Sequence, residues 1–436
     1  MELGKHLGKG IWGIADKTLP AVYGLGFVLL VIRVLPEEEF GNFVLIQEIF
    51  LIISGLAMGF ALQPMVKYVA EDRPDSGAII SAALFLNLVF VILCSIVSVV
   101  GRGPVSELLN SRGLNTLMLY IPALLLASFA RNFTLMLLQT RFMMKEIFWT
   151  DAAHFIGAVG LFAVFAHNGG IETAMDMINI NLISLSASSL VGLFFSRSLL
   201  RTRWRPQPAS VRLLLDYGRF SLGSVVSYLF YTKADSFFLS AFFGPVQVGV
   251  YNSVKVFLRV FETVTQVIAM FVLPAASLLS SKGDYQSLKA VTEKAISFTT
   301  IGLMPVFVLF VFFAEWLIGL LYGGRYLESV PLLRVFALLS FITPLYGVAT
   351  HTILGLGHAK VGFYLSVQLL VVSLVFYAVC VPVWGTLGAT IGYVGTSLIL
   401  TWAATRKLQE YVPFTLREIL SRTNDVRSFI QSRFVR

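Results

Sequence analysis

Apolar residues fill this chain in long runs, and short charged segments separate the runs. Twelve runs of roughly 20–32 residues are each long enough to cross a bilayer as an α-helix. They predict membrane crossings at residues 12–35, 40–63, 78–100, 114–139, 147–166, 177–199, 218–243, 248–274, 291–322, 329–355, 359–382 and 385–405. The pattern predicts an all-α integral membrane protein.

One predicted crossing carries a stripe of polar and charged side chains. In residues 249–273 these recur at every third or fourth position, at Asn252, Lys255, Arg259, Glu262 and Gln266. That spacing places them on one face of a helix. An ionised side chain at the bilayer centre costs at least ~2.5–3.5 kcal/mol. Such a face must look into a water-filled cavity or a protein interior, so the stripe predicts a transporter with a polar, largely cationic path.

Lysine and arginine are distributed unevenly between the two sides of the predicted bundle. Most lie in the N-terminal segment, in alternate loops and in the C-terminal tail, whereas the opposite loops hold only Arg102, Arg112 and Arg325. Because basic loops stay in the cytoplasm, we expect both termini to be cytoplasmic. The net charge of +9 mostly reflects this bias. The basic residues are dispersed without an aromatic platform, so we expect no nucleic-acid partner.

Composition excludes several other classes of protein. Residues are 57% hydrophobic and 13% charged, against about 25% charged in soluble domains. Cys94 and Cys380 fall inside apolar runs and are interpreted as small buried hydrophobes, not a disulfide or metal site. The five histidines are dispersed, and no nucleotide-binding or catalytic motif is recognisable. We expect a non-enzyme with no cofactor and no metal.

A charged loop divides the predicted crossings into two sets of six. It contains Pro206 and Pro208 and separates an N-terminal lobe, residues 1–200, from a C-terminal lobe, residues 218–406, with residues 201–217 as a cytoplasmic linker. The turns at 35–43 and 243–251 resemble each other in pattern. Two parallel repeats with a central cavity between them are therefore expected. Residues 407–436 form a basic tail, which is either disordered or an amphipathic helix on the anionic inner leaflet.

Several motifs, taken in order along the chain, carry a family resemblance. They are RVLPEEEFG (33–41), ADSFFL (234–239), VGVY (248–251), LPAAS (273–277), YGGRYLES (322–329), GLGHAK (355–360) and WGTLGAT (384–390). Together they resemble the polysaccharide-export flippases (Wzx type) of the multidrug/oligosaccharidyl-lipid/polysaccharide exporter superfamily. The resemblance runs over nearly the whole chain.

The resemblance implies a function and a set of partners. It implies a V-shaped bundle in the cell inner membrane that works by alternating access. The substrate would be a polyprenyl-diphosphate-linked oligosaccharide, moved from the cytoplasmic to the outer leaflet for surface polysaccharides such as O-antigen lipopolysaccharide or exopolysaccharide. Membrane lipids, a polysaccharide polymerase and chain-length machinery are the expected partners. Coupling to H⁺ or Na⁺ and drive by the membrane potential are open alternatives.

Charged residues inside the predicted crossings are the candidate site residues. A diphosphate is matched by arginine forks and lysine point charges. The candidates for a cationic, substrate-binding cavity are Arg259, Lys255, Arg131, Arg334, Lys233 and Arg33. The candidates for ion coupling or charge balance are Glu262, Asp235 and Glu48, and those for polar lining are Asn252, Gln266, Asn132 and Tyr231. For each, the alternative is a structural role, such as an interhelical pair or a side chain that snorkels to the interface.

Three rival functions are weighed against export of a lipid-linked glycan. A drug or small-cation exporter should have a net acidic cavity, whereas these crossings hold more basic than acidic candidates. Flippases of the peptidoglycan precursor often have two further crossings. A membrane-embedded glycosyltransferase usually carries a sizeable outer loop, and the outer loops here are short.

Overall fold

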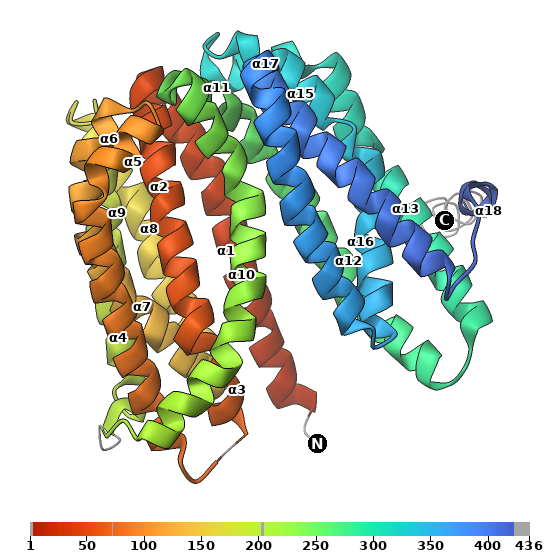
Figure 1. Cartoon of the computed structure of the whole chain (residues 1–436), viewed down its shortest axis with the longest axis horizontal. Coiled ribbons are helices and arrows are strands. Elements are labelled where there is room, and N and C mark those ends of the chain that lie inside the picture. The colour runs from red at the N-terminus through yellow and green to blue at the C-terminus, as the bar shows by residue number, and fades with distance from the viewer. Residues whose placement is uncertain (1–2, 72, 202–204, 423–436) are drawn as a thin grey trace. The chain divides into compact units, whose positions relative to one another are not determined.

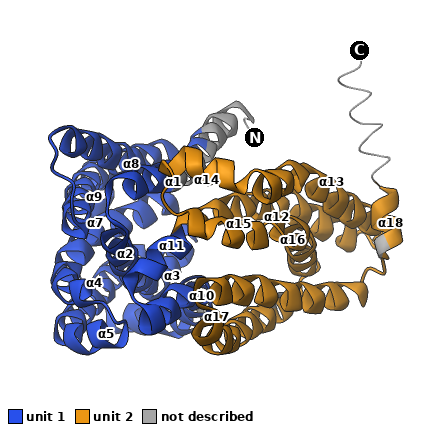
Figure 2. Cartoon of the chain, turned by 90° about the horizontal axis from the view of Figure 1, so that it is seen from above, with its two compact units in different colours: residues 1–252 blue, residues 253–436 orange. Residues whose placement is uncertain are grey.

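The computed structural model describes residues 3–71, 73–201 and 205–422, which form helices joined by short loops (Figure 1). No strand occurs in these ranges. The chain divides into two compact units, residues 1–252 and 253–436, coloured separately in Figure 2. The all-helical class predicted from the apolar runs is confirmed.

Unit 1 is built from long helices with short helical connections. Its elements are α1 (Leu3–Val34), α2 (Glu37–Ala57), the π-helical turn η1 (Met58–Leu62), α3 (Gln63–Ala70), α4 (Ser76–Val100), α5 (Arg102–Leu108), α6 (Arg112–Leu117), η2 (Met118–Tyr120), α7 (Ile121–Thr140), α8 (Met144–His167), α9 (Ala174–Ser196), η3 (Leu199–Arg201) and α10 (Pro208–Phe243). The next helix, α11 (Pro245–Lys255), runs across the division between the units.

Unit 2 is also built from long helices with short helical connections. Its elements are η4 (Val256–Leu258), α12 (Arg259–Ser281), α13 (Tyr285–Phe312), α14 (Ala314–Tyr322), η5 (Leu327–Ser329), α15 (Val330–Phe336), α16 (Leu339–Gly355), α17 (Ala359–Gln409) and α18 (Leu416–Ser421). The compact units divide within α11, whereas the predicted lobes divide at residues 201–217. The predicted lobes concern a sequence repeat, which this division does not test, so they stay a prediction.

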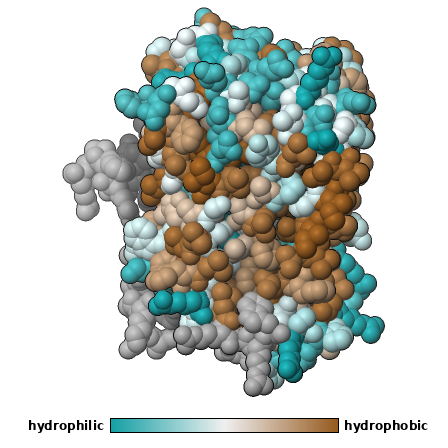
Figure 3. Space-filling view, turned by 90° about the vertical axis from the view of Figure 1, so that its left-hand side faces the viewer, coloured by the Kyte–Doolittle hydropathy of each residue, from teal (hydrophilic) through white to brown (hydrophobic). Residues whose placement is uncertain are grey.

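Each of the twelve predicted crossings falls on a helix, although their number is not established. Among the described residues, eight helices are long and apolar enough to span a membrane. A ninth span results if α15 and α16, which are bent by 41° at a short break, count as one. On the face shown in Figure 3, apolar side chains form a broad band between polar ends. These apolar helices identify the chain as a multi-pass membrane protein.

The longest helix, α17, contains a backbone break that separates two predicted crossings. Gly385 has φ 55° and ψ −129°, which a residue with a side chain adopts only at a cost. The continuous apolar stretch from Lys360 to Gln409 has 50 residues, far more than the about 20 that one crossing needs. The break therefore leaves two helices, each of a length that suits one crossing, as the sequence predicted for 359–382 and 385–405.

Two motif glycines let the start of α2 lie directly against the start of α11. A Cβ atom on Gly41 would lie 1.8 Å from the carbonyl oxygen of Pro245, and one on Gly249 would lie 2.8 Å from the carbonyl oxygen of Glu37. The two turns that resemble each other in sequence are thus packed reciprocally against each other. This explains why glycine occupies those positions in both turns.

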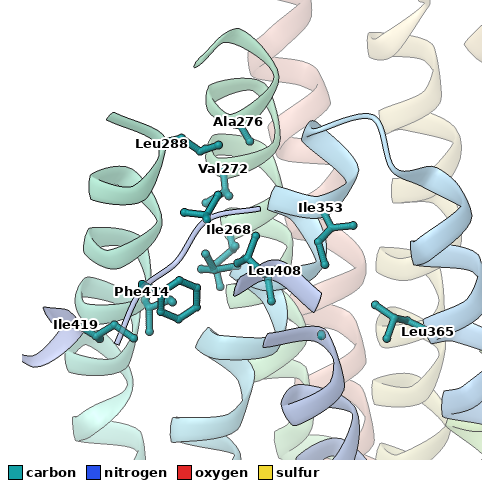
Figure 4. Close-up of a cluster of buried hydrophobic side chains, with 14 residues drawn as sticks. Ile268, Val272, Ala276, Leu288, Ile353, Leu365, Leu408, Phe414 and Ile419 are labelled. Atoms are coloured by element: carbon teal, nitrogen blue, oxygen red, sulfur yellow. The ribbon is translucent and has the colours of Figure 1, made fainter. Parts of the chain in front are cut away.

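In unit 2, the end of α17 and the segment after it pack into an apolar core. Leu408, Val412, Phe414 and Ile419 join buried side chains of α12, α13 and α16, as Figure 4 shows for several of them. Gln409 closes the intervening turn by donating a hydrogen bond to the carbonyl oxygen of Phe414 at 2.9 Å. The beginning of the predicted tail is therefore part of the folded unit. Val426, Phe429 and Ile430, which the amphipathic prediction also used, lie outside the described residues.

Charged contacts fix α18 to the first turns of α13. Glu293, only 1% exposed, accepts a hydrogen bond from Arg422 at 2.9 Å. Glu418 accepts one from Lys289 at 2.6 Å and closes a capping box with Thr415. The hydrogen bond from Lys289, and after it those from Thr415, lower the pKa of Glu418 to about 2.

We predict that Gly41→Ala destabilises the protein by about 1–3 kcal/mol, because the new methyl group overlaps the Pro245 carbonyl. Thermal unfolding in detergent measures the effect. The matched control is Gly26→Ala in α1, where a Cβ would meet nothing within 4 Å. Equal melting temperatures for the two variants would contradict the close approach.

We predict that Glu418→Gln accelerates hydrogen exchange of the α18 amides at pH 7, because it removes the bond from Lys289 and weakens the cap. The folded-state pKa of Glu418 is depressed to about 2 from 4.5. Its contribution to the stability of α18 is therefore fully present above pH 4.5. It is lost as the pH falls through 2. Exchange measured in wild type across this range should show protection disappearing. Glu328→Gln, an exposed change in η5, should leave exchange in α18 unchanged.

Candidate functional site

Arg131 of α7 forms an ion pair with Asp151 of α8 inside unit 1. The two side chains are 14% and 13% exposed. Arg131 also donates a hydrogen bond to Ser188 of α9 at 3.1 Å, and its guanidinium lies 5.9 Å from the ring centroid of Phe155. The pair thus connects three predicted crossings. Its low exposure places both charges in surroundings where each depends on the other.

Polar contacts extend this network to one further helix, α2, and add a second contact between α8 and α9. Asn132 donates a hydrogen bond to Ser54 of α2 at 2.9 Å. On the other side, Ser184 of α9 lies 3.2 Å from Nδ1 of His154. The network therefore joins α2, α7, α8 and α9. Asn132, predicted to line a cavity, is 8% exposed and takes part in helix packing.

Lys233 of α10 pairs with Glu48 of α2. The distance between Lys233 Nζ and Glu48 Oε1 is 3.4 Å, with the side chains 23% and 4% exposed. The sequence proposed these two residues for separate roles, one in binding and one in charge balance. The fold brings them together as one interhelical pair, the structural alternative that the sequence left open for each.

Asp235 lies fully buried against α11. One carboxylate oxygen accepts a hydrogen bond from the hydroxyl of Tyr251 at 2.7 Å, and the other accepts one from the backbone N–H of Ser236 at 2.8 Å. Asn252 donates to the Ser236 hydroxyl at 3.1 Å. The ADSFFL and VGVY motifs are thus adjacent in space. Their polar residues form one buried cluster.

The predicted polar stripe retains one common face in the structure. Lys255 and Arg259 are half-buried, and Glu262 and Gln266 are exposed. Five residues among them are buried, with exposures from 0% to 7% at Val254, Val256, Phe257, Leu258 and Phe261. The stripe is therefore partly exposed, while apolar side chains beside it in α11, η4 and the first turn of α12 are packed against the protein. Its predicted role in substrate binding stays a prediction.

A 3₁₀ turn interrupts the stripe between its two cations. Residues 256–258 form η4, after Lys255 and before Arg259. A 3₁₀ turn advances about 120° per residue against about 100° for an α-helix. Three residues therefore rotate the later part of the stripe by about 60°. This rotation broadens the polar face and does not scatter it.

The remaining predicted residues lie apart from these clusters. Arg334 is exposed in the last turn of α15, directly before the break that precedes α16. Arg33 is exposed in the last turn of α1, where snorkelling was the alternative. Tyr231 is half-buried on α10. Among the described residues, no group of three or more His, Cys, Asp or Glu side chains could hold a metal ion.

Sequence reasoning missed the residues that complete these clusters. Asp151 lies inside the predicted crossing 147–166 and was an available signal, because an ionised residue in a crossing deserves a functional hypothesis by default. Glu293 was similarly visible at the start of the crossing 291–322. The serines at 54, 184 and 188 gave no signal, because a buried serine is common in any helix.

The fold and these buried polar clusters define a class of protein. Apolar helices long enough to span a bilayer carry charged groups within the bundle. That construction is typical of multi-span membrane transporters. The chain belongs to the polysaccharide biosynthesis protein family, whose model matches residues 30–331.

Curated relatives are distant and cover most of the chain. The probable low-salt glycan biosynthesis flippase Agl15 of Haloferax volcanii is 20% identical over 375 residues, covering 85% of this chain and 77% of the relative. A membrane protein of Methanocaldococcus jannaschii, MJ1375, is 21% identical over 399 residues, covering 89% and 86%. The resemblance to a polysaccharide flippase family, predicted from the motifs, is confirmed.

Solved structures with the same fold are transporters. A multidrug resistance MATE family transporter of the MOP superfamily in an inward-facing conformation has a TM-score of 0.71 at 15% identity, covering 92% of this chain and 98% of that one. The lipid II flippase MurJ in an inward closed conformation has a TM-score of 0.76 at 14% identity, covering 94% and 89%. At such identities these likenesses establish the fold. The named relatives and structures are flippases or transporters, not catalytic enzymes.

We predict that Arg131→Gln and Asp151→Asn each destabilise the protein by about 3–5 kcal/mol, because each leaves an uncompensated charge among buried groups. The double variant should be more stable than either single variant. Unfolding of all four proteins gives the coupling energy by a double-mutant cycle. Strictly additive losses would contradict the mutual dependence of the two charges.

Proposed function

We propose that this chain is a flippase that moves a polyprenyl-diphosphate-linked oligosaccharide from the cytoplasmic to the outer leaflet by alternating access. It would act in the inner membrane during assembly of a surface polysaccharide such as O-antigen or exopolysaccharide. The family assignment supports the biosynthetic context. The printed name of the Haloferax volcanii relative supports a glycan as cargo.

The polar stripe of α11 and α12 is the observation that carries the substrate class. Lys255 and Arg259 retain access to their surroundings, and a diphosphate is matched by such a pair of cations. The same stripe carries the exposed side chains of Glu262 and Gln266, so its face is open to a ligand. The stripe is therefore our first choice for contact with the diphosphate, and Arg334 is the next because of its exposure.

The charge of the cargo gives a direction to transport. Moving one elementary charge across the membrane is worth ~2.3 kcal/mol per 100 mV. The cell interior is electrically negative, so outward movement of two negative charges is favourable. On the same basis it releases ~5 kcal/mol per 100 mV of membrane potential. The membrane potential is thus a sufficient bias. Glu262, exposed on the same stripe, is the candidate for H⁺ or Na⁺ coupling or for balancing the cationic path.

We predict that Arg259→Ala abolishes export while the protein remains inserted and folded, because the stripe loses the guanidinium that would bind the diphosphate. Surface polysaccharide at matched expression is the measurement. Lys282→Ala, an exposed change after α12, is the matched control and should export normally. Normal display by the Arg259 variant would remove this residue from the mechanism.

The proposed function is tested by measuring how much of the cargo lies in each leaflet of the membrane. In a host strain lacking the gene and any redundant flippase, labelled polyprenyl-diphosphate oligosaccharide is separated into inner and outer pools by an impermeant probe. Accumulation on the cytoplasmic side, reversed by the wild-type gene, is the expected result. No accumulation would overturn this cargo and favour export of small molecules.

A further inference from the structure

A cation held between two tyrosine rings lies at one end of unit 1. The ammonium of Lys67, on α3, is 5.0 Å from the ring centroid of Tyr68 and 4.4 Å from that of Tyr217 on α10. The two rings are 5.9 Å apart and meet edge to face. Figure 1 shows the end of α3 beside the early part of α10. The cluster therefore joins two helices that are far apart in the sequence.

Close helix packing holds the second ring in place. A Cβ atom on Gly218, the residue after Tyr217, would lie 2.3 Å from the carbonyl oxygen of Phe60 in η1. Further along the same interface, Gly59 and Gly55 face Val225 and Leu229 at 2.9 and 2.8 Å by the same measure. Small residues spaced by four let two membrane helices approach closely. The backbone at Tyr217 is thus held close to η1, which places its ring within reach of Lys67.

The polar groups of this cluster lack partners within the described ranges. Within those ranges Lys67 has ring contacts but no hydrogen bond or ion pair, and the hydroxyls of Tyr68 and Tyr217 make no hydrogen bond. The guanidinium of Arg73 also lies 5.6 Å from the ring centroid of Tyr68. Of the nearby carboxylates, Asp75 accepts hydrogen bonds from Arg73 at 3.0 and 3.5 Å. Glu71 is exposed at the end of α3 and lies in the field of Arg73. One ammonium and two phenol hydroxyls therefore remain as donors for an acceptor from outside the chain.

The depth of the cluster indicates what that acceptor is. Lys67 lies about one turn before the end of the apolar span Glu37–Ala70, and lysine and tyrosine at such positions meet the lipid phosphates. The basic loops predict that this end is cytoplasmic. We propose that Lys67, Tyr68 and Tyr217 form a binding site for a lipid-borne phosphate group in the cytoplasmic leaflet. Resting on the proposed function, this site receives the diphosphate of the cargo from the cytoplasmic leaflet at the start of transport.

Binding to the purified, full-length chain tests this site. The protein is held in nanodiscs of dioleoylphosphatidylcholine, and undecaprenyl diphosphate without sugar is the probe. Bound probe is counted by native mass spectrometry. Lys67→Gln should weaken binding about tenfold, the effect of losing one charge-assisted hydrogen bond. Tyr217→Leu should also weaken it, and Lys67→Arg should retain most of it because the charge remains.

Lys282→Gln is the matched control, because Lys282 is also exposed on the predicted cytoplasmic side but lies outside the cluster. Equal losses for the two lysine variants, or no loss for either, would overturn the site. A lower melting temperature of Lys67→Gln with unchanged binding would also overturn it and leave a helix clamp only.

Competition with dioleoylphosphatidylglycerol identifies the source of the phosphate. If that lipid displaces the probe at equal concentration, the site binds lipid phosphates in general. If it does not, the site selects the diphosphate, and both results support a lipid-phosphate site. The outcome is separable from the proposed function. A chain that binds the probe through Lys67 but does not flip the cargo would retain the site and overturn the function.

Discussion

An ionised side chain in apolar surroundings is stable only beside a group that compensates it, and this requirement organises unit 1. The Arg131–Asp151 and Lys233–Glu48 pairs each join helices that are distant in sequence. Each charge is tolerated only where its partner is presented, so the pairs restrict how α2, α7, α8 and α10 can be arranged. Ser188 and Ser54 then satisfy the neighbouring donors. Specific packing among otherwise uniform apolar helices therefore depends on a few polar contacts.

Glycine supplies the second constraint, because polar contacts need close backbones. Gly41 and Gly249 bring the starts of α2 and α11 together, and Asp235 can then meet Tyr251 at 2.7 Å. Gly218 does the same where α10 crosses η1. In lipid, helices gain little from apolar burial alone, so close van der Waals contact and interhelical hydrogen bonds carry association. The motif glycines and motif polar residues thus act as parts of one packing arrangement.

The sequence predicted the helices well because twenty apolar residues in a row have few alternatives in a membrane protein. It also predicted the polar stripe, since Lys255 and Arg259 lie on one continuous helical segment where spacing alone defines the face. It did not predict which charges pair. Glu48 and Lys233 are 185 residues apart, and no local pattern encodes a contact between separate helices. The same reason hid Arg422 and Glu293, whose contact makes the start of the tail part of unit 2.

In unit 2, irregular backbone occurs beside charged residues at two places. The 3₁₀ turn η4 lies between Lys255 and Arg259, and Arg334 lies in the last turn of α15, before the break that precedes α16. Both features cost free energy within a bilayer, the first through weaker backbone hydrogen bonds and the second through ionised groups. Each is tolerated where water or protein replaces lipid, so they are independent indications that these segments are shielded from lipid. Irregular backbone and ionised side chains occur in the same segments. This coincidence favours a polar path along α12 and α15 over a chance placement of charged residues on lipid-facing helices.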